Sequence, residues 1–289
     1  RTYDIDYPQV IAVYLKGTPR RGVGPHDVAI ALCKEVFASG AVKNKVLEFI
    51  GPGVDGLSVD FRCGIDVMTT ETTCLSSIWK TDEKVQNYYK THQREEDYTC
   101  LQPAEIAEYD GLIEIDLGQI EPMIALPFHP SNAYTIREFK ANAKKILADL
   151  DEEIKRQYPQ CSCCVSQKLD AEGFHVDQGV IAGCAGGIFE NITAADDILK
   201  GGSTGNGAFS LSVYPASQSV YLDLVQKGII SDLMEAGAVI KTAFCGPCFG
   251  AGDVPANNAF SIRHTTRNFP NREGSKPGDG QLSLVALMD

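Results

Sequence analysis

The sequence predicts an α/β fold, in which strands alternate along the chain with amphipathic helices. Three observations support this prediction. Residues 10–15 (VIAVYL) form an apolar run typical of a buried strand, residues 26–38 carry apolar side chains at helical spacing, and residues 45–50 (KVLEFI) return to a strand-like pattern. Strands that are separated by helices favour parallel pairing, because the helix returns the chain to the same edge of the sheet.

The residues at the ends of these segments are those expected there. Gly17 and Pro19 end the first strand, Pro25 begins the first helix, and Gly40 follows its end. The turn-rich stretch GPGVDG closes the second strand. Residues 112–117 (LIEIDL) then alternate between apolar and polar side chains, which predicts another strand.

A boundary between two domains is expected near Leu126, because the segment LPFHPSNAY interrupts the pattern with two prolines. The predicted domains are residues 1–126 and 127–289, each with a parallel or mixed sheet. The second half continues the alternation of strands and helices. We expect a helix over 135–157, a strand over 177–183, a helix that begins near Asn191, a strand over 209–213, helices over 217–236 and a strand (AVIKTAF) over 238–244.

Composition limits the classes of function. The 289 residues carry a net charge of -12, which argues against a nucleic-acid partner, because binding to phosphates needs a basic face. No apolar run approaches the roughly 20 residues that span a bilayer, so no membrane partner is expected. The ten cysteines are scattered rather than densely spaced, which favours free thiols in a reducing compartment, the cytoplasm. Cys33, within an amphipathic helical run, is expected to be buried.

Cysteines in two glycine-containing loops carry the most specific chemical signal. Cys-Gly-Pro-Cys occupies residues 245–248, and Cys184 stands in the loop GCAGG. Both loops follow predicted strands, and open α/β sheets bind ligands at the carboxyl ends of their strands. A Cys-x-x-Cys pair alone is a redox dithiol, half of a zinc site or two ligands of an iron–sulfur cluster. The flanking glycines leave backbone N–H groups available to sulfide, which favours the cluster.

Several segments together resemble the aconitase superfamily of iron–sulfur hydro-lyases, which includes aconitase and isopropylmalate isomerase. VIAGCAGGIFENITAADDILKG is similar to the first-ligand loop of that family, FCGPCFGAGD to its Cys-Gly-Pro-Cys pair, and RNFPNR to its substrate-binding arginine stretch. The similarity runs in order from about residue 8 to the end. It implies three-layer α/β domains equivalent to the second and third domains of a full-length aconitase. The first domain and the swivel domain would then lie outside this chain, in the same polypeptide or a separate subunit.

The resemblance also implies roles for individual residues. Cys184, Cys245 and Cys248 would hold a [4Fe-4S] cluster whose fourth iron stays open. This ligand set would leave the open iron free to bind a hydroxy di- or tricarboxylic acid.

Three further residues would act on the substrate. Glu71, in DVMTTE, would lie beside the open iron and serve in catalysis, and Arg267 and Arg272 would bind substrate carboxylates. The alternatives are that Glu71 is a solvent-exposed helix residue and that either arginine pairs with a structural carboxylate. For His264, close to the arginines, a contact with ligand remains open.

The sequence departs from the family pattern next to these residues. Val67 replaces an asparagine, Ala185 and Gly186 replace the Thr-Asn after the first ligand, Thr266 replaces an asparagine and Asn271 a glycine. Each change alters a polar group near the cluster or the substrate, and such groups commonly change affinity or activity by about 10- to 100-fold.

The leading hypothesis is therefore an aconitate hydratase-like hydro-lyase core. Because the family's catalytic base comes from the swivel domain, the isolated chain is expected to be inactive. The alternative is a catalytically altered homologue that keeps the cluster for sensing or interaction, and a structural zinc module is a third possibility. The cluster of Cys161, Cys163 and Cys164 is expected to be an exposed loop rather than a metal site.

Overall fold

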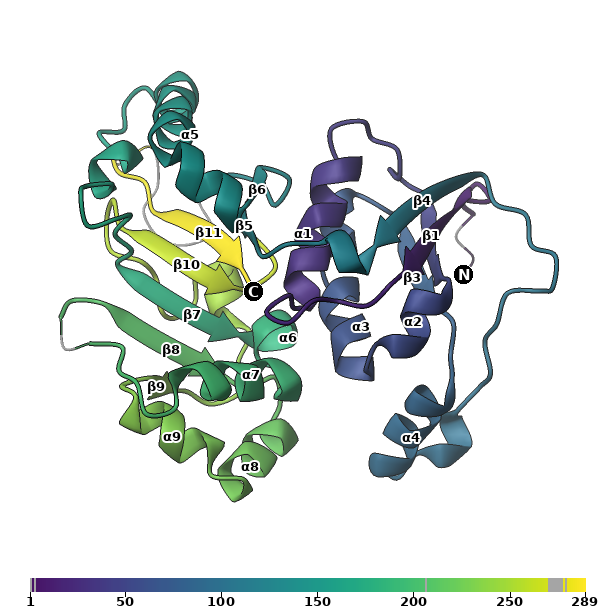
Figure 1. Cartoon of the computed structure of the whole chain (residues 1–289). Helices are drawn as coiled ribbons and strands as arrows, with labels where there is room; N and C mark the ends of the chain where they lie inside the picture. The colour runs from purple at the N-terminus through teal and green to yellow at the C-terminus, as the bar shows by residue number, and fades with distance from the viewer. Residues whose placement is uncertain (1, 3, 206, 270–277, 279) are drawn as a thin grey trace. The chain divides into compact units, whose positions relative to one another are not determined.

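The structure is a computed structural model that describes residues 2, 4–205, 207–269, 278 and 280–289. The chain divides into two compact units, Arg1–Ile120 and Glu121–Asp289, which are shown in Figure 1. The predicted boundary at Leu126 lies just after the first strand of the second unit, so the stretch 121–126 belongs to that unit. The α/β class with parallel and mixed sheets is confirmed.

The first unit contains a four-stranded parallel sheet in the order β3-β2-β1-β4. Its strands are β1 (Val10–Lys16), β2 (Val46–Ile50), β3 (Ser76–Trp79) and β4 (Gly111–Asp116). Its helices are α1 (Pro25–Val36), α2 (Pro52–Gly56), α3 (Val59–Asp66) and α4 (Glu83–Thr91), with 3-10 turns η1 (Thr69–Thr72), η2 (Glu95–Asp97) and η3 (Leu117–Gln119). The predicted strands and helix of this half are confirmed.

Alternation along β1 decides which face of this sheet is covered. Ile11, Val13 and Leu15 point into the core of the unit, where helix residues such as Val28 pack against them. On β4, by contrast, Leu112 is 66 % exposed. The helices therefore shield one face, and part of the other face is open to solvent within the described unit.

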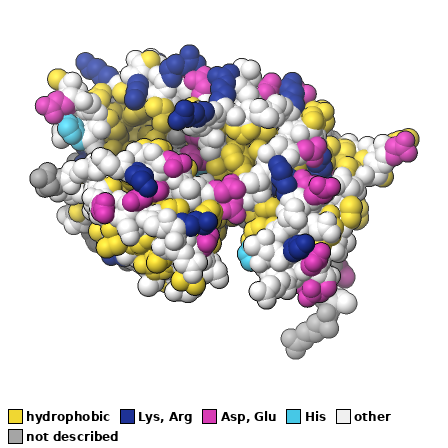
Figure 2. Space-filling view, turned by 60° about the horizontal axis from the view of Figure 1, so that its bottom comes forward, with side chains coloured by type: hydrophobic (Ala, Val, Ile, Leu, Met, Phe, Trp, Pro, Cys, Tyr) yellow, Lys and Arg dark blue, Asp and Glu magenta, His cyan; other side chains and the backbone are white. Residues whose placement is uncertain are grey.

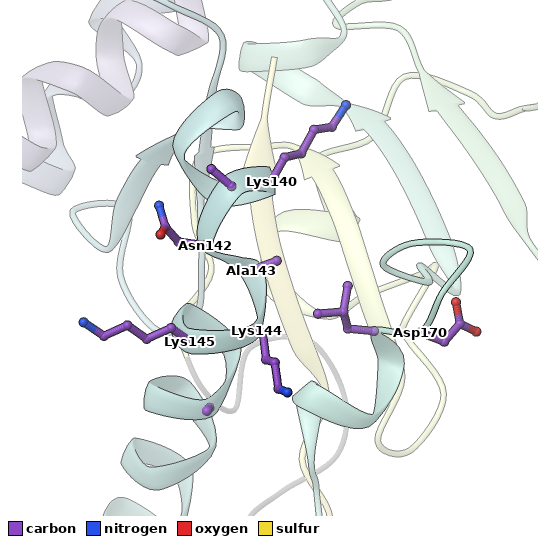
Figure 3. Close-up of a pocket in the computed structure, with 9 residues that line it drawn as sticks. Lys140, Asn142, Ala143, Lys144, Lys145 and Asp170 are labelled. Atoms are coloured by element: carbon purple, nitrogen blue, oxygen red, sulfur yellow. The ribbon is translucent and has the colours of Figure 1, made fainter.

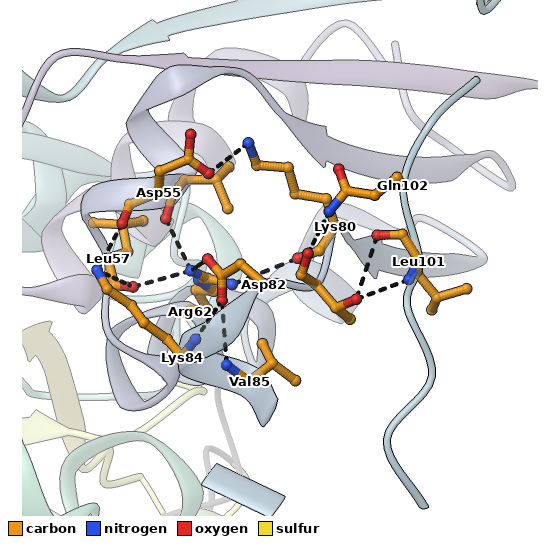
Figure 4. A network of polar contacts seen from close by, with 11 residues as sticks. Asp55, Leu57, Arg62, Lys80, Asp82, Lys84, Val85, Leu101 and Gln102 are labelled. Carbon is orange, nitrogen blue, oxygen red and sulfur yellow. Dashed lines mark hydrogen bonds and ion pairs between the residues drawn. The ribbon is translucent and has the colours of Figure 1, made fainter. Parts of the chain in front are cut away.

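A buried arginine joins α3 to the segment that enters α4. Arg62 donates from Nη2 to the carbonyl oxygens of Val54 and Leu57, both at 3.1 Å, and also to the carboxylate of Asp82, as drawn in Figure 4. Asp82 Oδ1 in turn accepts from the N–H groups of Lys84 and Val85, which caps α4. The Asp82 carboxylate thus neutralises the buried Arg62 guanidinium and caps the N-terminus of α4.

We predict that Asp82→Ala lowers the free energy of unfolding of the first unit by about 3 kcal/mol, because it leaves the Arg62 guanidinium buried without this counter-charge. The single tryptophan of the chain, Trp79, stacks on Phe49 with 4.0 Å between ring centroids and reports on this unit. Urea unfolding followed by tryptophan fluorescence measures the loss. The control is Asp97→Ala, which removes the exposed ion pair with Arg94 and should cost less than about 1 kcal/mol. Equal losses would contradict the prediction.

The second unit contains a seven-stranded mixed sheet in the order β6-β5-β11-β10-β7-β8-β9. The strands from β11 to β9 pair in parallel, and β5 and β6 join antiparallel at the edge next to β11. The strands are β5 (Met123–Ala125), β6 (Ala133–Thr135), β7 (Gln178–Ala182), β8 (Ser210–Tyr214), β9 (Val239–Ile240), β10 (Phe260–His264) and β11 (Leu284–Met288). The helices are α5 (Ile136–Gln157), α6 (Gly183–Gly186), α7 (Phe189–Leu199), α8 (Gln218–Gln226) and α9 (Ile229–Glu235), with 3-10 turns η4 (Val165–Lys168) and η5 (Gly246–Phe249).

One predicted strand is much shorter than expected. The apolar run 238–244 forms a strand only at β9, where Val239 and Ile240 pair with β8. Beyond this point Lys241 still donates its N–H to the carbonyl of Val213, but β8 ends at Tyr214 and offers no further partner. Because β9 is an edge strand, β8 is its one pairing partner in the sheet. Where β8 ends, the apolar residues after Ile240 have no strand with which to form backbone hydrogen bonds.

The two faces of this sheet have different coverings. The register aligns Ile262 of β10 with Gly179 of β7 and Leu211 of β8, so these residues share one face. Ile262 packs in the cluster formed with α5, and Leu211 packs in the cluster formed with α7 and α9. The opposite face carries Arg263, which binds the carbonyl oxygen of Pro247 in η5. The Cys-Gly-Pro-Cys segment therefore lies on the face that these helices leave open.

The face under α5 is incompletely filled. A hollow of about 630 Å³ lies beside the middle of α5 and is lined by Lys140, Asn142, Lys144 and Asp170 among others, as Figure 3 shows. An apolar cavity of about 380 Å³ adjoins it and reaches Ile262. Helix α5 departs from helical geometry at Asn142, where φ is -125°.

Basic and acidic side chains are intermingled over the face of the molecule seen in Figure 2. Ion pairs such as Lys168–Asp177 at 2.7 Å and Lys200–Asp232 at 2.6 Å join opposite charges on the surface of the second unit. Within the described ranges, no helix is both long and apolar enough to cross a membrane.

The segment with three cysteines is a loop, as predicted, but it is partly buried, so the expectation that it is exposed is wrong. Asp151 of α5 accepts hydrogen bonds from the N–H groups of Val165 at 2.6 Å and Ser166 at 3.1 Å. The Cys164 thiol donates to the same carboxylate at 3.2 Å, and Cys163 is buried. A buried carboxylate with several donors thus anchors the segment to the helix.

We predict that Asp151→Ala lowers the free energy of unfolding of the second unit by about 2–4 kcal/mol, because three donors lose their acceptor in a buried site. Thermal unfolding followed by near-ultraviolet circular dichroism of its tyrosines measures the change. Asp149→Ala, on the exposed side of the same helix, is the matched control and should change stability by less than about 0.5 kcal/mol. If both variants unfold like the parent chain, the carboxylate does not anchor the segment.

Candidate iron–sulfur and carboxylate site

The first cysteine follows directly after a central strand. β7 ends at Ala182, and Gly183 turns the chain with φ of +67°, a value that favours glycine. Cys184 then stands exposed at the start of α6. Its pKa is raised, chiefly because surrounding protein atoms partly desolvate the sulfur although the residue as a whole is exposed, and then by the charge of Cys245. Hydrogen bonds from the N–H groups of Cys184 and Ala185, and the charge of Arg267, act in the opposite direction.

The second and third cysteines lie on one tight turn. Cys245 precedes η5 and is exposed, whereas Cys248, within η5, is 3 % exposed. The N–H of Cys248 donates to the carbonyl of Cys245 at 3.2 Å. A Cβ atom placed on Gly246 would lie 1.9 Å from the carbonyl oxygen of Ala251, so only glycine fits at position 246.

The structure gathers residues from three separate loops of the second unit. The pKa of Cys184 responds, after burial, to the charges of both Cys245 and Arg267, which places these groups within electrostatic reach of its sulfur. Arg267 is half-buried and follows β10, the strand beside β7. Arg272 lies outside the described residues.

The sulfur atoms of the three cysteines are suitable ligands for an iron–sulfur cluster. All three cysteines are free thiols, and thiolates are the usual ligands of iron–sulfur clusters. Among the described residues, no three His, Cys, Asp or Glu side chains converge as a single metal ion requires. A cluster attaches each thiolate to a different iron, so it does not require this convergence.

Two buried polar atoms near Arg267 add a second indication of a ligand. Thr265 Oγ1 and Asn268 Oδ1 are buried, and within the described part of the chain neither has a hydrogen-bond partner. The amide of Asn268 is held from its other end, because Nδ2 donates to the carbonyls of Ala125 at 3.3 Å and Leu126 at 2.8 Å. Buried polar atoms normally have a partner. Sequence patterns did not single out these residues, although both lie in the arginine stretch or next to it.

The glycine at position 186, after the first ligand, has a packing explanation. A Cβ on Gly186 would lie 2.5 Å from the carbonyl oxygen of His264, so β10 leaves no room for a side chain at position 186. Asn191 Nδ2 donates to the carbonyl of Ala185 at 2.8 Å and lies 3.5 Å from His264 Nε2. Burial lowers the pKa of His264, and the charge of Asp289 opposes this effect. His264 therefore packs directly against the Cys184 loop at Gly186.

Glu71 belongs to the first unit, in the turn η1 that follows Val67 at the end of α3. It is 5 % exposed, so the alternative of a solvent-exposed helix residue is wrong. Burial is the main cause of the raised pKa of Cys33, and the charge of Glu71 adds to it. The Glu71 carboxylate therefore lies close enough to Cys33 within the first unit for its charge to act on that thiol.

Comparison with known proteins agrees with this arrangement of motifs. A family model described as the aconitase family (aconitate hydratase) matches residues 1–288. The 3-isopropylmalate dehydratase large subunit of Clostridium botulinum (strain Alaska E43 / Type E3) is 32 % identical over 281 residues, which cover 97 % of this chain and 59 % of the relative. The corresponding large subunit of Clostridioides difficile (strain 630) is 30 % identical over 284 residues, with 97 % and 59 % covered.

This chain therefore spans about 59 % of the length of these curated relatives. The match covers both structural units, including the two cysteine loops and the strands from which they emerge. The chain belongs to the aconitase family.

Proposed function

We propose that this chain is the cluster-bearing part of an iron–sulfur hydro-lyase that removes water from, or adds it to, a hydroxy di- or tricarboxylic acid. One observation carries the proposal. Cys184, Cys245 and Arg267 come from three loops of one sheet, and the charges of the other two act on the Cys184 thiol. Thiolate ligands beside a carboxylate-binding guanidinium suit a metal-bound hydroxy acid.

Cys184, Cys245 and Cys248 would hold the [4Fe-4S] cluster. When bound through three thiolates, such a cluster supplies an open iron that acts as a Lewis acid toward hydroxyl and carboxylate oxygens. The free atoms Thr265 Oγ1 and Asn268 Oδ1 would hydrogen-bond to the ligand or to ordered water.

The side chains of this chain would orient the substrate and move one proton. Arg267 would bind a substrate carboxylate with its planar fork, and Arg272 would bind a second one. Glu71 would donate a proton to the leaving hydroxyl and take it back in the hydration direction. The base that removes the carbon-bound proton would come from outside this chain, so the isolated chain would bind ligand without turnover.

The relatives favour particular candidates for substrate and partner. Their name, 3-isopropylmalate dehydratase large subunit, describes a dicarboxylic substrate and an enzyme with more than one subunit. We therefore propose 3-isopropylmalate as the first substrate to test, ahead of citrate and isocitrate, and a separate chain or segment as the source of the missing base. Free thiols and a labile cluster suit the reducing cytoplasm.

The decisive test is anaerobic reconstitution with iron and sulfide, followed by metal analysis and EPR spectroscopy after mild oxidation. We expect about four irons per chain and, after oxidation, the signal of a cluster that has lost its open iron. Cys184→Ser should abolish the signal, because it removes one of three anchors. Cys164→Ser is the matched control, since its thiol binds Asp151 instead and should leave iron uptake unchanged.

The possible outcomes separate the alternatives. Zinc uptake without iron would support a structural zinc module and overturn the hydro-lyase proposal. A cluster that forms but never binds the tested hydroxy acids, even with the complementary subunit present, would favour a sensing or interaction role.

We further predict that Gly246→Ala reduces cluster occupancy at least about tenfold, because a methyl group there meets the Ala251 carbonyl at 1.9 Å and forces the two cysteines apart. Iron content per chain after reconstitution measures the loss. Gly207→Ala is the control, since a Cβ at that position meets nothing within 4 Å. Equal iron content in both variants would show that the turn tolerates the displacement.

A further inference from the structure

A buried arginine lies beneath the Cys-Gly-Pro-Cys turn. Arg263, on β10, is 0 % exposed and is the largest fully buried side chain among the residues that the structure describes. A charged side chain is rarely buried unless its hydrogen-bonding groups are satisfied. The reason for its burial lies in what its guanidinium contacts.

Its guanidinium binds the two ends of the segment that carries two proposed cluster ligands. Nη1 donates to the carbonyl oxygen of Pro247 at 2.7 Å, between Cys245 and Cys248. Nη2 donates to the carbonyl oxygen of Asp253 at 2.5 Å, at the far end of the same segment. One planar group therefore holds the start and the end of the stretch 245–253.

The same guanidinium is itself held by the central strands. Nε donates to Ser261 Oγ at 3.0 Å, and Nη2 donates to Gln178 Oε1 at 3.0 Å. Gln178 also donates from Nε2 to the carbonyl oxygen of Asp253 at 3.1 Å. Gln178 lies on β7, the strand that leads to Cys184. The network therefore connects the segment that carries Cys245 and Cys248 to the strand that positions Cys184.

Beyond η5, the segment adopts backbone conformations that need support from other parts of the chain. Gly250 and Gly252 have φ values of +82° and +101°, and Asp253 has φ of +46°, which is unfavourable for a residue with a side chain. After η5, the segment to Asp253 contains no regular helix or strand. Tyr214 Oη donates to the Asp253 carboxylate and adds a second tie at this end.

We propose that Arg263 is a positioning residue that clamps the segment 245–253 and thereby sets the spacing of Cys245 and Cys248 relative to Cys184. This inference rests on the proposed function for its purpose, but the clamp itself is a property of the cluster-free chain. Lysine cannot replace it, because a single ammonium group lacks the two-pronged geometry that reaches both carbonyls.

The test compares Arg263→Lys with the parent chain by amide hydrogen exchange before any cluster is added. We expect exchange within 246–253 to become about tenfold faster or more, because hydrogen bonds to a charged group are lost from both ends of the segment. Exchange in β7 and β11 should change far less. The rate of iron loss after reconstitution should rise in parallel.

The matched control is Arg62→Lys in the first unit. Arg62 is also buried and also donates to two backbone carbonyls, those of Val54 and Leu57. The same substitution there should leave exchange within 246–253 unchanged. If Arg263→Lys does not fold, a second variant is Gln178→Leu, which removes the side-chain oxygen that accepts a hydrogen bond from Arg263 Nη2. This variant should speed amide exchange in the same segment by about threefold or more.

Each outcome decides the proposal. Unchanged exchange within 246–253, or equal acceleration throughout the second unit, would overturn the clamp and leave Arg263 as a general stabilising residue. Faster exchange confined to the segment supports it. If the parent chain takes up no cluster while this selective change is seen, the hydro-lyase proposal fails and the clamp stands.

Discussion

The candidate site depends on the parallel pairing of β7 with β10. This pairing aligns Ile181 with His264 at the carboxyl ends of the two strands. The chain leaves β7 through Gly183 to reach Cys184, and it leaves β10 through Thr265 to reach Arg267. Because both exits lie at the same edge of the sheet, a thiol and a guanidinium from distant parts of the sequence come within electrostatic reach.

Close backbone approach at this edge explains the small residues beside the first ligand. The carbonyl of His264 occupies the space that a side chain at Gly186 would need, and the carbonyl of Tyr214 does the same at Gly187, 2.2 Å from a Cβ placed there. Polar support is supplied by other side chains instead, such as Asn191 on α7. The loss of a polar residue at position 186 is therefore a consequence of packing, and it does not by itself indicate lost chemistry.

Many regular elements could be predicted from the sequence, because their apolar periodicity is local, but the strands β3, β5, β6 and β11 and the short helices α2, α3, α4 and α6 were not predicted. The predicted helix over 135–157 is α5, and the strands at 10–15, 45–50 and 112–117 are present. β10 was missed because Arg263 and His264 interrupt its apolar pattern, and both are buried only through tertiary contacts. The run 238–244 was overpredicted for the opposite reason, since its apolar character is strand-like but no neighbouring strand accompanies it beyond Ile240.

The sequence by itself singled out the candidate site residues: its spacing pointed to three cysteines in two glycine loops, and the family resemblance added a glutamate after a short helix and an arginine stretch near the end. Such motifs consist of residues that are close in the sequence, so they can be recognised without knowledge of the fold. The tertiary structure alone decided the surroundings of each group, such as the burial of Glu71 and the contacts of Arg263 with Pro247 and Asp253. The physical reason is that burial and hydrogen bonding depend on strand register and loop packing between segments far apart in the chain.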